Sequence, residues 1–68
     1  MENMFKDNLK YLRQERGIGQ VKLAEDLGVG KGTISLWENG LREPSMSSLI
    51  AIASYFGVTI DYLVGIEK

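Results

Sequence analysis

At 68 residues, the chain has room for a single domain with one small hydrophobic core. It contains no cysteine and no histidine, which excludes disulfide bonds, thiolate zinc sites and the commonest catalytic base, so apolar packing must stabilise the fold. The hydrophobic fraction of 44% and the charged fraction of 25% are those of a folded domain and not of a disordered tail.

The first two predicted elements are amphipathic helices. Residues 4–16 and 20–27 carry apolar side chains three or four positions apart, the spacing that places them on one face of a helix. Gly17 and Gly28 follow these segments and can adopt the left-handed conformation that commonly ends a helix. We therefore expect both helices to pack one face against the core.

A short link, residues 28–30, leads to a third predicted helix over residues 31–39. Ile34 and Trp37 are three positions apart and are expected to face inward, while the other face is small and mostly polar. Gly40 ends the segment. We interpret Trp37 as a core side chain and not as a platform for a nucleic-acid base.

Ser45 and Thr59 are predicted to cap the last two helices, over residues 46–56 and 60–64. The helical stripes thus predict an all-α class, with residues 1–68 forming one compact five-helix domain. The predicted core consists of Leu9, Leu12, Leu23, Ala24, Leu27, Val29, Ile34, Trp37, Leu49, Ile52, Ala53, Phe56, Val58 and Leu63.

Two short helices joined by a tight turn, at about residues 20–39, are typical of a DNA-reading helix-turn-helix. In such a motif Ala24 must be small because the second helix packs across it, and Val29 must fill the corner between the helices. Ile34 must reach back into the core. Outward side chains at the start of the second helix can then approach base edges in the major groove.

The chain resembles the lambda-repressor and Cro-like helix-turn-helix regulators in the order and spacing of LAEDLGV, TIS, WENG, REPS and FGVTIDYLV, over nearly its whole length. The resemblance implies a lambda-repressor-like DNA-binding domain that acts as a transcriptional regulator, expected to be a repressor, on a palindromic operator in double-stranded DNA. A homodimer is expected, at least on DNA, because one recognition helix exposes few base-reading side chains. No cofactor and no metal are expected.

Eight positions match those that contact DNA in the family that the chain resembles. One opens the first helix of the motif and usually touches the DNA backbone, five reach toward the major groove, and two lie where the following loop grips phosphates. In that order they are Gln20, then Lys31, Gly32, Thr33, Ser35 and Leu36, then Asn39 and Arg42. In similar proteins, a salt bridge at the positions of Arg13 and Glu38 joins the first helix to the recognition helix.

Several of these positions have a simpler interpretation. Gln20 and Arg42 are equally well explained as phosphate contacts or as ordinary surface residues that face water. Asn39 could be a helix-end residue, and this role is compatible with a phosphate contact. Lys31, in register at the recognition helix, is interpreted as a base-reading residue and not as a solvated lysine.

Four positions depart from the family pattern. Gly19 and Gly30 stand where many members have Ser or Thr caps, a replacement that costs only a few tenths of a kcal/mol. Gly32 and Leu36 stand where polar or basic residues are common, so base readout is expected to rest on fewer side chains. Leu36 is either exposed by chance or a contact for a thymine methyl group.

An enzyme is disfavoured because the acidic residues Glu25, Asp26, Glu38 and Glu43 lie on separate short elements without paired or metal-binding spacing. The alternative is an antitoxin-like protein-interaction module with weak DNA binding. The formal net charge of -1 favours this alternative, since phosphate binding relies on Lys and Arg. Residues 1–42 nevertheless carry seven basic against six acidic residues, which is compatible with a local basic face.

Four apolar or aromatic residues remain once the predicted core is filled: Tyr62, Ile66, Ile50 and Tyr55. They predict a dimer interface at the carboxyl-terminal end, with scattered exposure as the alternative. The chain has no apolar run that could span a bilayer, and its first ten residues lack the basic-then-apolar layout of a signal peptide. We therefore expect a cytoplasmic protein without a membrane partner.

Overall fold

The structure is a computed structural model that describes residues 3–66. Its helices are α1 (Phe5–Arg16), α2 (Gln20–Leu27), α3 (Thr33–Glu38), α4 (Met46–Phe56) and α5 (Ile60–Val64). None of the described residues forms a β-strand. The predicted all-α, five-helix fold is confirmed, and the bounds of α2, α4 and α5 are those expected from the sequence.

The third helix is shorter than the sequence predicts. It was expected to begin at Lys31, whereas α3 begins at Thr33 and is also one residue shorter at its other end. The Thr33 N–H donates to the Gly30 carbonyl at 3.0 Å, so Lys31 and Gly32 lie in a turn before the helix. Glycine loses more backbone entropy in a helix than other residues do, and the two glycines of this turn account for the late start.

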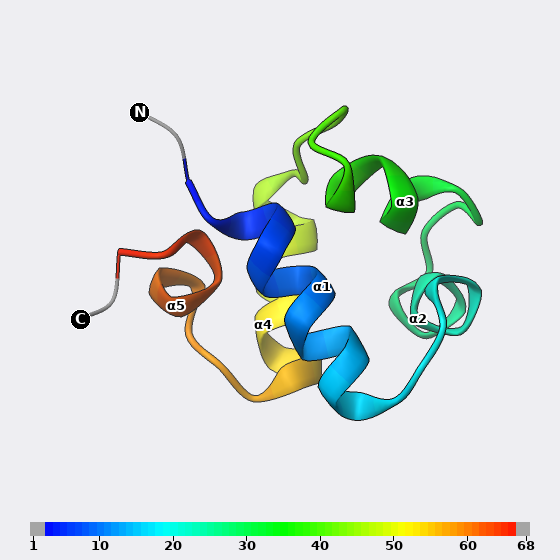
Figure 1. The fold of residues 1–68 in the computed structure, drawn as a ribbon, viewed down its shortest axis with the longest axis horizontal. Helices are drawn as coiled ribbons and strands as arrows, with labels where there is room; N and C mark the ends of the chain where they lie inside the picture. The colour runs from blue at the N-terminus through cyan, green and yellow to red at the C-terminus, as the bar shows by residue number, and fades with distance from the viewer. Residues whose placement is uncertain (1–2, 67–68) are drawn as a thin grey trace.

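Figure 1 shows α1 across the middle of the molecule, with α2 and α3 on one side and α5 on the other. α1 packs against α3 and α5, α4 packs against α2 and α5, and α2 packs against α3. The domain measures 30 × 24 × 20 Å. No helix within residues 3–66 is long and apolar enough to cross a membrane.

The core is built from the stripes that the sequence predicts, with one addition. Its buried side chains are Phe5, Leu9, Leu23, Ala24, Ile34, Trp37, Ile52, Ala53, Phe56 and Leu63. Phe5 was missing from the predicted core, and its ring packs edge-on against Trp37 with the ring centroids 6.2 Å apart. The other predicted core residues are half-buried at its margin: Leu12, Leu27, Val29, Leu49 and Val58.

Tyr55 is not the leftover surface residue that the sequence predicts, because it joins three helices. Its ring packs against the core, and its hydroxyl donates to Asp26 Oδ2 at 2.7 Å. The Arg16 guanidinium lies over the Tyr55 ring, 5.3 Å from the centroid. The hydrogen bond between Tyr55 and Asp26 lowers the pKa of the Asp26 carboxyl and raises the pKa of the Tyr55 hydroxyl. The network ties the end of α1 and the end of α2 to α4.

The start of α1 is bonded to the end of α5. Asn8 Nδ2 donates to the carbonyls of Tyr62 and Leu63 at 2.9 and 3.2 Å. The Met4 N–H donates to the Val64 carbonyl at 3.0 Å. The bonds to Leu63 and Val64 satisfy carbonyl groups at the end of a short helix. The Tyr62 carbonyl also accepts from the Gly65 N–H at 3.1 Å.

Candidate nucleic-acid interface

α2 and α3 form the predicted helix-turn-helix. Gly28 ends α2 with a φ of 71°, and the Val29 N–H donates back to the Ala24 carbonyl at 3.0 Å. The Ala24 and Ile34 side chains are 1% and 0% exposed, as the close crossing of the two helices requires. α3 is thereby packed on the core through one face and leaves its other face toward solvent.

Glu38, at the end of α3, accepts hydrogen bonds from two other elements. Arg13 Nε donates to Glu38 Oε2 at 2.7 Å and Arg13 Nη2 donates to Oε1 at 3.0 Å, which is the bidentate geometry of a strong ion pair. The side chains of Arg13 and Glu38 are only 12% and 4% exposed. The hydrogen bond to Glu38 raises the pKa of Arg13, against the effect of burial. The salt bridge that the family resemblance implies is therefore formed between α1 and α3.

Gln20 belongs to the same network, which the sequence did not reveal. Its Nε2 donates to Glu38 Oε1 at 3.1 Å, so the start of α2 is also bonded to the end of α3. The amide nitrogen carries two hydrogens, and the bond to Glu38 uses one of them. The bond also sets the orientation of the amide group. The remaining hydrogen can be donated to an acceptor outside the protein, such as a phosphate oxygen.

The five positions predicted to approach the major groove lie before α3 and on its first turns. Lys31 and Gly32 are exposed in the preceding turn, and Thr33, Ser35 and Leu36 are half-buried on the helix. An α-helix with its side chains is about 10–12 Å in diameter, and the major groove of B-DNA is about 12 Å wide and admits one. The exposed cation Lys31 stands just before the N-terminal end of α3.

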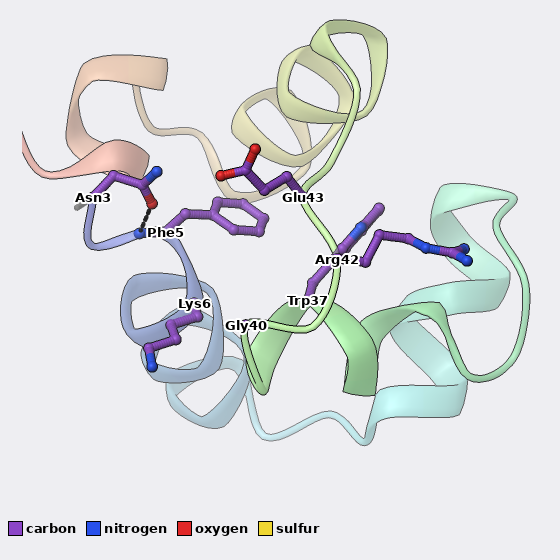
Figure 2. A pocket seen from close by; sticks show the side chains of 7 residues that line it. All are labelled: Asn3, Phe5, Lys6, Trp37, Gly40, Arg42 and Glu43. Carbon is purple, nitrogen blue, oxygen red and sulfur yellow. Dashed lines mark hydrogen bonds between the residues drawn. The ribbon is translucent and has the colours of Figure 1, made fainter. Parts of the chain in front are cut away.

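Of the two predicted phosphate-contact residues after α3, Asn39 is hydrogen-bonded within the protein and Arg42 is exposed to solvent. Asn39 Nδ2 donates to the Ser35 carbonyl at 2.8 Å and to the Ser35 hydroxyl oxygen at 3.2 Å. The amide thus stabilises the last turn of α3, in the manner of a helix-end residue. Arg42 is exposed, and its guanidinium extends away from the loop (Figure 2).

α1 brings a further cation to this end of α3. Lys6 and Arg42 line the same cavity of about 400 Å³, and the Lys6 side chain lies against Gly40, which follows 34 positions later. Figure 2 shows this cavity and its lining side chains. No motif in the sequence marks Lys6, because its place beside Gly40 depends on the packing of α1 against α3.

Two acidic side chains of the motif, Asp26 and Glu38, are paired with cations. Asp26 Oδ1 lies 3.1 Å from Lys22 Nζ, and Glu38 is bound by Arg13. Across the described part of the chain, residues 3–66, no group of three or more acidic side chains is placed to hold a metal ion. The surface around α3 presents the cations Lys6, Lys31 and Arg42 and the carboxylate of Glu43, together with amide and hydroxyl groups.

Two short helices crossing over a small residue, with an ion pair behind the second helix and polar groups in front of it, define a lambda-repressor-like helix-turn-helix domain. The helix-turn-helix family model matches residues 9–63. The chain belongs to this family of transcriptional regulators.

Known proteins of the family cover most of the chain. The HTH-type transcriptional activator BcrR of Enterococcus faecalis is 42% identical over 64 residues, which are 94% of this chain and 31% of BcrR. A transcriptional regulator from Listeria innocua has a crystal structure that matches with a TM-score of 0.91 at 34% identity, over 100% of this chain and 64% of that one. The P22 c2 repressor, crystallised in complex with a synthetic operator, matches with a TM-score of 0.85 at 27% identity, over 93% of this chain and 96% of that one.

The chain spans less than two thirds of the length of several curated relatives. It covers 31% of BcrR, 53% of the Bacillus subtilis regulator YqaE and 55% of the Vibrio cholerae phage repressor RstR. The likeness to these proteins therefore concerns their helix-turn-helix part.

Proposed function

We propose that this protein regulates transcription by binding operator DNA, with α3 in the major groove. The observation that carries the proposal is the exposed Lys31 in the turn that leads into α3, a helix that the Arg13–Glu38 pair holds in place. A fixed helix presents its side chains to the bases without a further ordering cost on binding. The likeness to the P22 c2 repressor, which was crystallised with a synthetic operator, supports the binding of operator DNA.

In this mode the site residues divide into two groups. Lys31 donates to a guanine edge, and Thr33 and Ser35 offer hydroxyl groups to neighbouring bases. Gln20 and Arg42 contact phosphates on the two sides of the groove and set the position of α3 without reading the sequence.

We further infer that the operator is palindromic, that a homodimer binds it and that the output is repression. Two-fold pairing doubles the small number of base-reading side chains that one α3 offers. Repression requires only that the protein occupy a site that the transcription machinery needs, which a DNA-binding domain can do. BcrR, which is similar to this chain, is named an activator, so DNA binding by such a domain does not by itself decide between repression and activation.

The test is selection of bound duplexes from a random DNA library, followed by comparison of Lys31→Ala with Lys22→Ala on the selected site. Lys31→Ala is expected to weaken specific binding by about 1–3 kcal/mol and to relax the preference at one base pair of each half-site. Lys22→Ala removes the same charge from a lysine that pairs with Asp26 on α2, and is expected to leave the preference unchanged.

Unchanged affinity and preference in Lys31→Ala would show that the recognition helix is wrongly assigned. If the library yields no enriched site and binding shows no dependence on salt, DNA binding is refuted, and the protein-interaction module becomes the better description.

A further inference from the structure

A cavity lies at the end of α3, beside the proposed interface, and two cations are among its lining residues. It has a volume of about 400 Å³ and is lined by Asn3, Phe5, Lys6, Trp37, Gly40, Arg42 and Glu43. Phe5 and Trp37 are 5% and 3% exposed and supply apolar lining. Figure 2 shows Lys6 and Arg42 extending on opposite sides of the turn at Gly40.

Lys6 is held beside this turn by its aliphatic stem. A Cβ added at Gly40 would lie 3.3 Å from Lys6 Cδ and 3.8 Å from Lys6 Nζ, so the stem passes over the glycine backbone. A lysine can bury its stem along a surface and keep its ammonium group in water. The ammonium group is thus placed next to the loop that carries Arg42, although the two residues belong to α1 and to the α3–α4 loop.

The backbone of the turn has few hydrogen-bond donors left for an anion. The N–H groups of Asn39, Gly40 and Leu41 donate to the carbonyls of Ser35, Trp37 and Leu36 at 3.0, 3.2 and 2.9 Å. The Asn39 amide nitrogen also donates to Ser35. These three N–H groups are therefore occupied, and the side-chain cations Lys6 and Arg42 are the charged donors next to the turn.

We propose that Lys6 contacts a DNA backbone phosphate next to the one bound by Arg42, so that α1 is part of the DNA interface. The proposal rests on the proposed function and extends it beyond the helix-turn-helix. Phosphates carry one negative charge each and follow one another along the strand, which suits two cations on the two sides of one turn. The Glu43 carboxylate also lines the cavity, and its negative charge disfavours a phosphate within it, so the proposed phosphates lie outside the cavity, at Lys6 and Arg42.

The test compares three variants on the selected duplex by measuring affinity at several salt concentrations. Lys6→Met removes the charge and keeps the stem that covers Gly40, and Lys6→Arg keeps a charge. Lys22→Met removes the same charge on α2, where Lys22 pairs with Asp26. Each phosphate contact contributes about 0.9 to the slope of log K against log salt, so Lys6→Met is expected to lower the slope by about one.

Both proteins lose affinity when the salt concentration rises from about 50 to about 200 mM. Because of the lower slope, this loss is expected to be roughly threefold smaller for Lys6→Met than for the unchanged protein. The site preference is expected to stay the same, and Lys6→Arg and Lys22→Met are expected to keep the original slope. A Lys6→Met slope equal to that of the unchanged protein overturns the contact while leaving the proposed function standing. If the unchanged protein shows no salt-dependent binding, the proposed function fails and the inference fails with it.

Discussion

At the scale of single residues, Glu38 is the charged group on which the orientation of α3 depends. It receives two hydrogen bonds from Arg13 and one from Gln20 while only 4% of its side chain is exposed. A carboxylate removed from water to this extent is favourable only because all three donors are present. The same three bonds join α1, the start of α2 and the end of α3.

Glu38→Gln is therefore expected to lower the free energy of unfolding by about 1.5–3 kcal/mol, the range for lost hydrogen bonds to charged groups. The amide has the size of the carboxylate, so the change leaves no cavity, but it leaves the Arg13 guanidinium without its counter-charge. Urea unfolding measures the difference. Glu15→Gln on α1 is the control, since Glu15 is exposed and its loss is expected to change stability by less than about 0.5 kcal/mol. Equal midpoints for the two variants would contradict this role of Glu38.

At the scale of the elements, the five helices differ in how their first turns are bonded. Gly19 and Gly32 precede α2 and α3 and supply no side-chain cap, whereas Ser45 and Thr59 accept hydrogen bonds at the starts of α4 and α5. The two helices of the motif therefore depend on packing and on the Glu38 network for their stability. The helices behind them carry the caps that the sequence predicts.

Removal of the α4 cap tests this difference. The Ser45 hydroxyl oxygen accepts from the Ser48 N–H at 3.1 Å, and Ser45→Ala leaves that donor without its partner. The expected cost is about 1 kcal/mol in the free energy of unfolding. Ser54→Ala, at an exposed position within α4, is the matched control and is expected to be neutral or slightly stabilising, because alanine favours a helix interior. Thermal unfolding of both variants decides the point, and similar losses of stability would refute the cap.

At the scale of the whole molecule, the proposed dimer needs a surface that the core does not use. Ile50 and Ile66 are 54% and 57% exposed, whereas Tyr62 is half-buried. Tyr55, which the sequence also placed in this surface, is occupied by its packing and by its bond to Asp26. The candidate interface is thus reduced to the two isoleucines with the edge of Tyr62.

We expect two protomers to bind one palindromic duplex, with half-sites one helical turn, about 34–36 Å, apart. Ile66→Asp places a charge in the apolar contact and is expected to weaken the two-to-one complex. Tyr11→Asp introduces the same charge at another exposed aromatic position, 54% exposed on α1, and is expected to leave the stoichiometry unchanged. Sedimentation with and without the duplex measures both, and a single protomer per palindrome at saturation would exclude the dimer.

Local patterns were sufficient to predict most of the fold. The predicted core contained nine of the ten buried residues, and the bounds of α2, α4 and α5 followed from spacing, glycines and caps. These features depend on residues that are only a few positions apart, so the amino-acid sequence shows them directly. α3 was predicted too long because Gly32 disfavours the helical conformation within the segment that was expected to begin at Lys31.

The amino-acid sequence alone was enough to define the five-helix class, the helix-turn-helix and, through the family resemblance, the Arg13–Glu38 pair. Only the tertiary structure decided that Gln20 shares Glu38, that Tyr55 is bonded to Asp26, and that Lys6 lies beside Gly40. Each of these contacts joins residues at least 18 positions apart on different elements. Their partners are chosen by the way the helices pack, and no spacing along the chain encodes that choice.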